Sequence, residues 1–135
     1  MFDTKVALVV REDLATWQKL NVVAFLATGI AASAPEAIGE PYIDAADVQY
    51  GRMLIQPMMI YGSDGDALRK VRHKAIEREI TVVPYIEAMF STGNDEENRR
   101  VFREEGVETM NLVGLAVRGP RNAVDKVIKG LSLHL

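Results

Sequence analysis

The chain has 135 residues, of which 48% are hydrophobic and 26% are charged, a composition that is ordinary for one globular domain. Its 19 acidic and 16 basic residues give a net charge of −3, which argues against a general nucleic-acid binder because such proteins carry clustered positive charge. The sequence contains no cysteine, so disulfides, thiolate nucleophiles and cysteine-ligated metals are excluded, and its two histidines, His73 and His134, stand too far apart to suggest a zinc site.

The first elements expected are a buried strand and a long apolar helix. Residues 6–10 form a short, β-branched apolar run, which is typical of a strand buried on both faces. A polar turn follows, in which Asp13 or Thr16 is a candidate N-cap for a helix that runs to about Ser33. The apolar face expected for this helix comprises Leu14, Trp17, Leu20, Val23, Leu26 and Ile30. Its apolar stretch is shorter than the ~20 residues of a membrane span and no signal sequence is visible, so we expect a cytoplasmic protein without membrane contact.

Small residues recur at every fourth position of this helix, at Ala24, Thr28 and Ala32. They let another backbone approach closely, which favours tight packing onto the sheet or, as the alternative, part of a dimer seam. Residues 34–51 contain several prolines and glycines and are expected to be irregular. So long a connection in a compact domain is often functional or forms an interface.

The rest of the chain is expected to alternate strands with helices. The expected strands are residues 52–61, 80–86 and 111–118. The expected helices are one that opens with a Ser63–Asp66 capping box and ends near Arg78, one at residues 95–105 capped by Asn94, and one from Pro120 to Gly130. Four strands alternating with four helices favour an α/β fold, a three-layer α/β/α sandwich in a single domain of residues 1–135.

Polar side chains gather at the ends of two predicted strands. Arg11 and Asp13 follow the first strand, at the position where open α/β sheets place ligands. Lys19 stands near the start of the next helix, where a cation opposes the helix dipole at a cost of ~0.3–1 kcal/mol. A substrate-anchoring role would explain that choice, and a solvated lysine is the simpler alternative.

The loop at residues 87–94 follows the third strand and carries a carboxylate, two hydroxyls and an amide. Such loops position polar groups for binding or catalysis, although Thr92 and Asn94 are equally suited to capping the following helix. No phosphate-binding motif, nucleophile elbow or metal-spaced carboxylate set is present in the sequence, so neither a metal nor a cofactor is expected. The predicted catalytic residues are Lys19, Glu87 and Ser91, and the predicted ligand-binding residues are Arg11, Asp13, Thr92 and Asn94.

Three stretches carry a resemblance to a known family: VVREDL at residues 9–14, the lysine and leucine at residues 19–20, and LVGLAVRGP at residues 112–120. Through them, and over nearly its whole length, the chain resembles the type II peptidyl-tRNA hydrolases. It is closest to an uncharacterised branch of that superfamily, a family of domains of unknown function. The resemblance implies a mixed four-stranded sheet with one antiparallel strand and helices on both faces, often in a dimer.

The resemblance also assigns roles to individual residues. The catalytic lysine of the hydrolases corresponds to Lys19, and their polar loop corresponds to residues 87–92, with Met89 at a glycine position. The polar helix pair of the family falls near Val23 and Leu26, which are apolar. These replacements and the net charge of −3 argue against tRNA as a partner.

Three functions follow from these observations. The leading hypothesis is a homodimer of unknown biochemical role that binds a small polar or anionic ligand at a remodelled site. The alternatives are an active hydrolase of peptidyl-tRNA or a related ester, and a non-catalytic interaction module. Whether the protein is an enzyme stays open at this stage.

Overall fold

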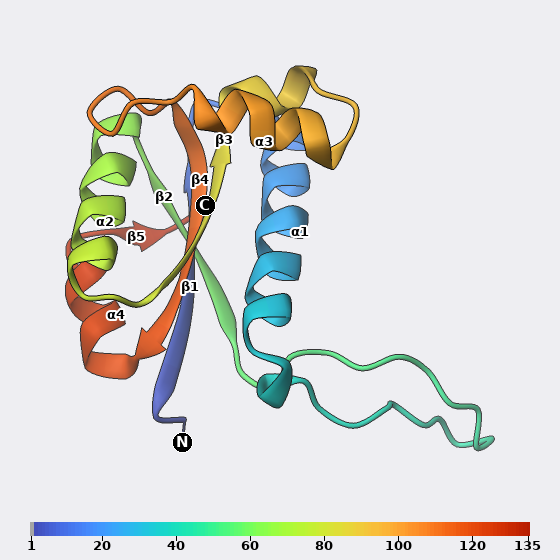
Figure 1. Ribbon diagram of the computed structural model, residues 1–135. Coiled ribbons are helices and arrows are strands. Elements are labelled where there is room, and N and C mark those ends of the chain that lie inside the picture. The colour runs from blue at the N-terminus through green and yellow to red at the C-terminus, as the bar shows by residue number, and fades with distance from the viewer. Residues whose placement is uncertain (1) are drawn as a thin grey trace.

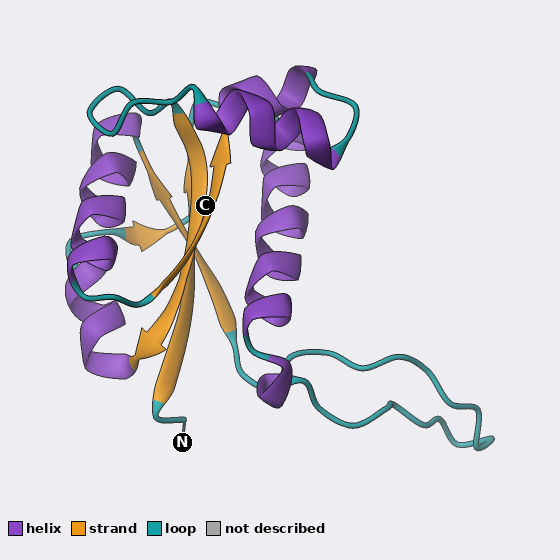
Figure 2. Cartoon of the chain, viewed as in Figure 1, coloured by secondary structure: helices purple, strands orange, loops and turns teal. Residues whose placement is uncertain are grey.

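The computed structural model describes residues 2–135 as a five-stranded sheet with helices on both faces (Figure 1, Figure 2). The strands are β1 (Thr4–Arg11), β2 (Met58–Ser63), β3 (Thr81–Ile86), β4 (Leu112–Pro120) and β5 (Ser132–Leu133). The helices are α1 (Thr16–Ser33), α2 (Gly65–Glu77), α3 (Asp95–Arg103) and α4 (Arg121–Val127), with short 3-10 helices η1 (Pro35–Ala37) and η2 (Glu87–Ser91). α1 covers one face of the sheet, α2 and α4 cover the other, and α3 lies across one end (Figure 1).

The sheet is mixed, with the strand order β3-β4-β1-β2-β5. β1 and β2 are parallel, β4 is antiparallel to both β1 and β3, and β5 is antiparallel to β2. The expected α/β class is therefore confirmed, but the expected sheet of four strands with one antiparallel strand is wrong, because the sheet has five strands and both β4 and β5 run antiparallel to the others. β5 has only two residues, both exposed, and main-chain pairing with Tyr61 and Gly62 holds it, so no apolar periodicity signals it in the sequence.

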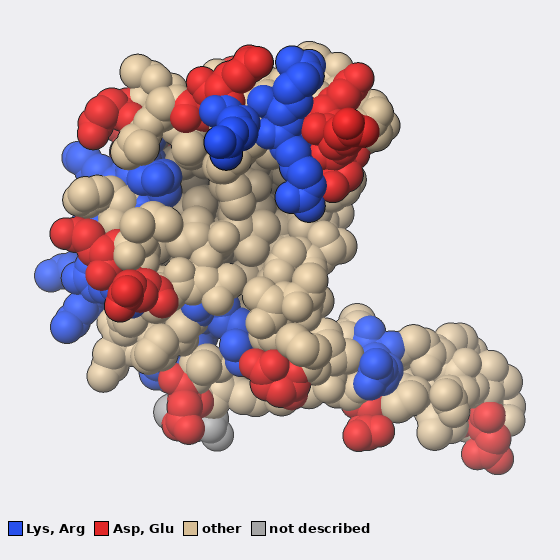
Figure 3. Space-filling model, viewed as in Figure 1, with Lys and Arg blue, Asp and Glu red and all other residues tan. Residues whose placement is uncertain are grey.

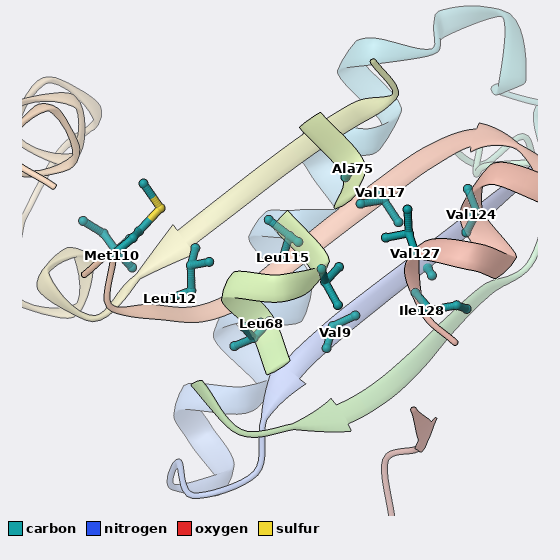
Figure 4. Packing of buried hydrophobic residues seen from close by; sticks show 13 residues of the cluster. Val9, Leu68, Ala75, Met110, Leu112, Leu115, Val117, Val124, Val127 and Ile128 are labelled. Atoms are coloured by element: carbon teal, nitrogen blue, oxygen red, sulfur yellow. The ribbon is translucent and has the colours of Figure 1, made fainter. Parts of the chain in front are cut away.

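β1 lies at the centre of the sheet, and its side chains are buried on both faces, as expected from its continuous apolar run. Val6, Leu8 and Val10 face α1 and pack in one apolar cluster. Ala7 and Val9 face α2 and α4 and pack in a second cluster, which Figure 4 shows. The strand thus joins two cores, one on each side of the sheet.

The start of α1 differs from the prediction. Its N-cap is Ala15, so neither Asp13 nor Thr16 caps the helix. The side-chain oxygen of Gln18 instead accepts a hydrogen bond from the Ala15 N–H at 3.0 Å. The Gln18 side chain thus reaches back from the first turn of the helix and satisfies the N–H of the N-cap residue, which has no hydroxyl or carboxylate of its own.

The buried face of α1 also differs from the prediction. The fully buried residues of this helix are Val22, Leu26 and Ile30. Trp17 and Leu20, which were expected to face the core, are 60% and 67% exposed. The stripe of Ala24, Thr28 and Ala32 is exposed too, so its expected packing onto the sheet is wrong. Because the helix is apolar nearly all round, its sequence pattern does not identify the buried face.

The next two helices begin with side-chain caps. The carboxylate of Asp64 accepts the Ala67 N–H at 2.8 Å and caps α2, whereas Ser63, the predicted cap, is the last residue of β2. The side-chain oxygen of Asn94 accepts the Glu97 N–H at 2.8 Å, which confirms the predicted cap of α3. Among the helices of residues 2–135, none combines the length and the apolar character that a membrane crossing requires.

Residues 38–56, which we call the arm, project from the body of the molecule beyond α1 (Figure 1). The arm has two legs, joined by antiparallel bridges between Ile38 and Leu54 and between Ile43 and Gln49. The strand expected at residues 52–61 therefore begins late, directly after Pro57. Proline lacks the N–H that a ladder needs, so it marks the point where the chain leaves the arm and enters the sheet.

Candidate functional site

The C-terminal ends of three strands and the N-terminal start of a fourth lie at the same end of the sheet, which we call its carboxyl edge. β1 ends at Arg11, β2 ends at Ser63, and Glu87 directly follows β3. Because β4 runs antiparallel to β1 and β3, Asn111, which precedes it, lies at the same edge. Open α/β sheets bind ligands at the carboxyl ends of their parallel strands, so these polar side chains form the candidate site.

Arg11 is the centre of a hydrogen-bond network at this edge. Its Nε donates to Asp13 Oδ1 at 2.6 Å, and its Nη1 donates to Asn111 Oδ1 at 2.9 Å. Nη1 also lies 3.4 Å from the main-chain oxygen of Leu112, and Nη2 lies 3.9 Å from Glu87 Oε2. The side chain of Arg11 is only 16% exposed, so these contacts hold a largely buried guanidinium in one orientation.

Glu87 is tied to the residue that precedes β4. The Asn111 side-chain Nδ2 donates to Glu87 Oε2 at 2.5 Å, and the Glu87 N–H donates to the Asn111 main-chain oxygen at 3.0 Å. The Asn111 N–H donates to Glu105 Oε1 at 3.1 Å. The structure thus brings together three of the seven predicted site residues, Arg11, Asp13 and Glu87, around an asparagine.

A cleft of about 450 Å³ opens beside this network, between the ends of β1 and β2 and the start of α2. Its lining residues are Arg11, Glu12, Asp13, Ser63, Asp64, Gly65, Ala67 and Leu131. The Glu12 N–H donates to the Ser63 main-chain oxygen at 3.0 Å, which fixes the two strand ends relative to each other. The walls of the cleft are therefore built from a β-ladder on one side and a capped helix on the other.

The cleft carries more negative than positive charge. Glu12, Asp13 and Asp64 line it against one guanidinium, that of Arg11. Glu87, whose side chain is 54% exposed, adds a carboxylate next to the same guanidinium. Solvent screens these exposed carboxylates, but their number favours a ligand that donates hydrogen bonds or carries positive charge over a simple anion.

Lys19 lies in a different groove, of about 320 Å³, on the side of α1 that faces β2. The residues that line this groove with it are Val10, Thr16, Leu20, Val23, Ile60, His134 and Leu135. Glu87 and Ser91 are not among them, so the structure does not bring the three predicted catalytic residues into one groove.

The remaining predicted residues lie around the start of α3. Ser91 is exposed at the end of η2. The Thr92 hydroxyl donates to the main-chain oxygen of Met89 at 2.9 Å and contacts the side-chain oxygen of Asn98. Asn94 caps α3 through its side chain. The contacts of Thr92 and Asn94 are those of a loop that holds a helix start in place.

Within residues 2–135, no cluster of three or more histidine, aspartate or glutamate side chains is arranged to hold a metal ion. His73 is 70% exposed and lies 3.7 Å from Glu77 on the same helix, which is a surface position. The polar side chains at this end of the sheet carry one guanidinium, one amide, one hydroxyl and several carboxylates.

Sequence reasoning missed Asn111 and Glu12. Asn111 stands directly before the last long strand, and that strand's direction was not assigned from the sequence. An antiparallel strand starts where its parallel neighbours end, so its preceding residue joins their site. Glu12 was treated only as the end of the first strand, although it stands between two residues that were predicted to bind ligand.

A sequence model of the family described as "Protein of unknown function (DUF2000)" matches residues 4–135. The chain is similar to the solved structure of a protein of unknown function, Atu0240, from Agrobacterium tumefaciens strain C58. That similarity covers 100% of both chains, with 50% sequence identity and a TM-score of 0.97. A comparison with curated proteins finds no match.

Proposed function

Because this chain belongs to the DUF2000 family of proteins of unknown function, we propose its function from the geometry of its cleft. The proposed function is binding of a small polar ligand that carries an amino or other cationic group, in the cleft beside Arg11. The observation that carries this proposal is the set of three carboxylates, Glu12, Asp13 and Asp64, that lines the cleft against one guanidinium, with Asp13 hydrogen-bonded to Arg11 and Asp64 to the Ala67 N–H. Polar groups fixed before binding lose little entropy when a ligand arrives.

The size of the cleft suits a small molecule. Its volume of about 450 Å³ falls within the ~300–1,000 Å³ that small-molecule sites occupy. Five of its eight lining residues are polar or charged, among them Ser63 and three carboxylates. A ligand with several hydroxyl or amino groups would pair with these side chains, whereas an apolar ligand would leave them without partners.

The charge of the lining supports a cationic group over an anionic one. Asp13 already occupies the Nε of Arg11, and Asn111 occupies its Nη1, so little of the guanidinium is left for an anion. The carboxylates of Glu12 and Asp64 are exposed in the same cleft. We therefore narrow the expected ligand from polar or anionic to polar and cationic.

Ester hydrolysis is the weaker candidate. It would need Lys19 and Glu87 to act on one bond, but Lys19 lies in a separate groove that does not include Glu87 and is lined mostly by apolar residues. Glu87 accepts a hydrogen bond from Asn111 and faces Arg11, which gives it a structural role in the network. The proposal therefore assigns binding and no chemical step.

The test compares glucosamine with glucose, since the two sugars differ by one amino group, and adds inorganic phosphate as an anion. Backbone amide shifts of the labelled protein report where each probe binds. We expect glucosamine at millimolar concentration to shift the amides of Ser63, Gly65 and Ala67, with weaker shifts from glucose and none from phosphate.

Asp64→Asn is the matched variant, because asparagine keeps the hydrogen bond that caps α2 and removes only the charge. We expect it to weaken glucosamine binding about two- to fivefold, the equivalent of the ~0.5–1 kcal/mol of an exposed ion pair. Asp95→Asn removes the same charge from the first turn of α3 and should change nothing. Cleft shifts from phosphate but not from glucosamine, or no cleft shifts from glucosamine, would overturn the proposal.

A further inference from the structure

The arm is ordered by its own hydrogen bonds, yet most of its large apolar side chains are exposed; Leu54, at its base, packs against the core. At its tip, Asp44 Oδ1 accepts the N–H groups of Ala46 and Val48 at 2.8 and 3.0 Å, and Asp44 Oδ2 accepts the Tyr50 hydroxyl at 2.7 Å. The exposed large apolar residues of the arm are Tyr42, Ile43, Val48, Tyr50, Met53 and Ile55. A two-stranded ribbon is marginally stable alone in water, so this arm needs a surface.

The outward face of α1 is a second unpacked apolar surface. Trp17, Leu20 and Phe25 are 60%, 67% and 54% exposed. The small residues Ala24, Thr28 and Ala32 share their exposure and leave room for a close approach. The only charged residue in the whole of α1 is Lys19. A surface helix normally turns polar residues outward, and a large exposed apolar patch marks an interaction site.

Aromatic rings extend this surface from α1 onto the neighbouring loop. The ring of Trp17 meets that of Phe90 at a centroid distance of 5.8 Å, and Phe90 meets Tyr85 at 5.4 Å. Tyr85 in turn meets Phe25 at 6.0 Å. These contacts pack Trp17 and Phe25 of α1 against Phe90 of η2 and against Tyr85, which is itself buried at the end of β3.

The position of the arm identifies a second copy of the chain as the occupant. The arm leaves the body near the C-terminal end of α1 and extends beyond the helix (Figure 1). If two α1 helices pack antiparallel about a twofold axis, each arm emerges beside the N-terminal half of the partner's α1. That half carries Trp17 and Leu20, the most exposed apolar residues of the helix.

Length and area fit this arrangement. At 1.5 Å per residue, the 18 residues of α1 span ~27 Å, and a leg of about eight extended residues spans ~26 Å. The large apolar side chains of the two surfaces are about half exposed, which leaves roughly 100 Å² on each. Together they approach the ~800 Å² per partner that a stable interface buries.

Charge supports this arrangement only locally, through the arginines of α3. The tip of the arm carries Asp44 and Asp47. α3 lies across the end of the sheet at which α1 starts, and its arginines Arg99, Arg100 and Arg103 follow an acidic first turn. Figure 3 shows basic side chains flanked by acidic ones at that end of the molecule and acidic side chains at the far end of the arm. An arm that lies across the N-terminal half of the partner's α1 brings its acidic tip toward the end that holds these arginines.

We propose that the protein forms a twofold-symmetric homodimer in which the outward faces of α1 pack together and each arm lies across the N-terminal half of the partner's α1. The two surfaces are separate from the cleft beside Arg11, so the dimer can be tested independently of the proposed ligand.

The test is the mass of the full-length chain in sedimentation experiments at micromolar concentration. We expect twice the 15.0 kDa of one chain. Ala24→Arg on α1 should yield the mass of a single chain, and so should the arm variant that combines Ile43→Asp with Met53→Asp. Ile76→Asp is the matched control, because Ile76 is 52% exposed on α2 and should leave the dimer intact. Circular dichroism of each variant confirms that it is folded.

Crosslinking tests the position of the arm directly, and the chain has no cysteine of its own to interfere. A tagged chain with Tyr42→Cys is mixed with an untagged chain with Leu20→Cys, and a short bismaleimide is added. We expect a tagged–untagged product, and none when Ile76→Cys replaces Leu20→Cys. A wild-type monomer, a dimer that survives both surface variants, or a dimer that depends on α1 but not on the arm would overturn the proposal.

Discussion

At the scale of single residues, Asp44 orders the tip of the arm. The hydrogen bond from the Tyr50 hydroxyl is the largest cause that lowers the pKa of this carboxyl below its ordinary 3.8, and the N–H groups of Val48 and Ala46 add to it. The same bond raises the pKa of Tyr50 above its ordinary 10.0. A lowered pKa means that the bonds stabilise the tip from pH 3.8 up to the pH at which Tyr50 itself ionises, and are lost as the pH falls through the lowered value.

Tyr50→Phe is expected to raise the pKa of Asp44 toward its ordinary value, because it removes the main donor to the charged carboxylate. The measurement is a carbon-detected NMR titration of the Asp44 carboxyl group. As the pH is lowered, the amides of Ala46 and Val48 should also lose their protection against hydrogen exchange at a higher pH than in the wild type. Tyr42→Phe removes a hydroxyl from the same arm and serves as the control. An unchanged Asp44 titration in Tyr50→Phe would contradict the assignment.

Only some of the residues of the site could be predicted from the sequence. Arg11, Asp13 and Glu87 were identified because they follow strands that local composition predicts well. Asn111 was missed because its place depends on the direction of β4, which is a property of long-range pairing. Lys19 was selected as a cation near a helix start and by resemblance to a catalytic lysine. The groove that holds it is set by the packing of α1 on the sheet, which sequence spacing does not determine.

At the scale of elements, the sequence predicts those that depend on local signals and does not predict those that depend on long-range contacts. β1 and the cap of α3 follow from short stretches of sequence, an apolar β-branched run and an Asn-x-x-Glu pattern. The face of α1 does not, because only Val22, Leu26 and Ile30 are fully buried although most of the helix is apolar. β5 and the arm depend on pairing between distant main-chain segments, which leaves no periodicity to read.

The packing of α1 on β4 depends on a close approach at Gly114. A β-carbon added there would overlap the Cγ1 of Val22 and lie 3.2 Å from the Cδ1 of Leu26 and 3.4 Å from the main-chain oxygen of Val9. We expect Gly114→Ala to lower the free energy of unfolding by ~1–3 kcal/mol, the usual cost of overpacking a core. Urea denaturation measures this change.

The control for this prediction is Gly93→Ala, since nothing lies within 4 Å of a β-carbon there, and its effect should stay within ~0.5 kcal/mol. Combining Gly114→Ala with Val22→Ala removes the overlapping methyl group. The double variant should therefore lose less stability than the sum of the two single variants. Additive losses would show that the helix does not approach the sheet at this point.

At the scale of the whole molecule, the proposed surfaces occupy different regions. The cleft lies at the carboxyl edge of β1 and β2, beside α2, on the face of the sheet opposite α1. The arm and the outward face of α1 lie on the other side of the molecule (Figure 1). A dimer built through α1 therefore leaves both clefts open to solvent, so ligand binding and assembly can be measured separately.

The charge of the whole chain bears on the hydrolase alternative. An enzyme that holds tRNA must neutralise several phosphates with clustered lysines and arginines, and this chain has 19 acidic against 16 basic residues. Figure 3 shows acidic side chains beside the basic ones on the face in view rather than a broad basic field. The carboxylates around Arg11 would further repel a phosphate backbone at the site.

We expect no measurable tRNA binding at about 150 mM salt, where the Debye length is ~8 Å and only a clustered basic surface retains RNA. Incubation with peptidyl-tRNA should release peptide at the background rate, and Lys19→Ala should leave that rate unchanged. A known peptidyl-tRNA hydrolase in the same assay shows that the substrate is competent. Release above background that disappears in Lys19→Ala would restore the hydrolase interpretation and would require Lys19 and Glu87 to act together in a conformation other than the one described.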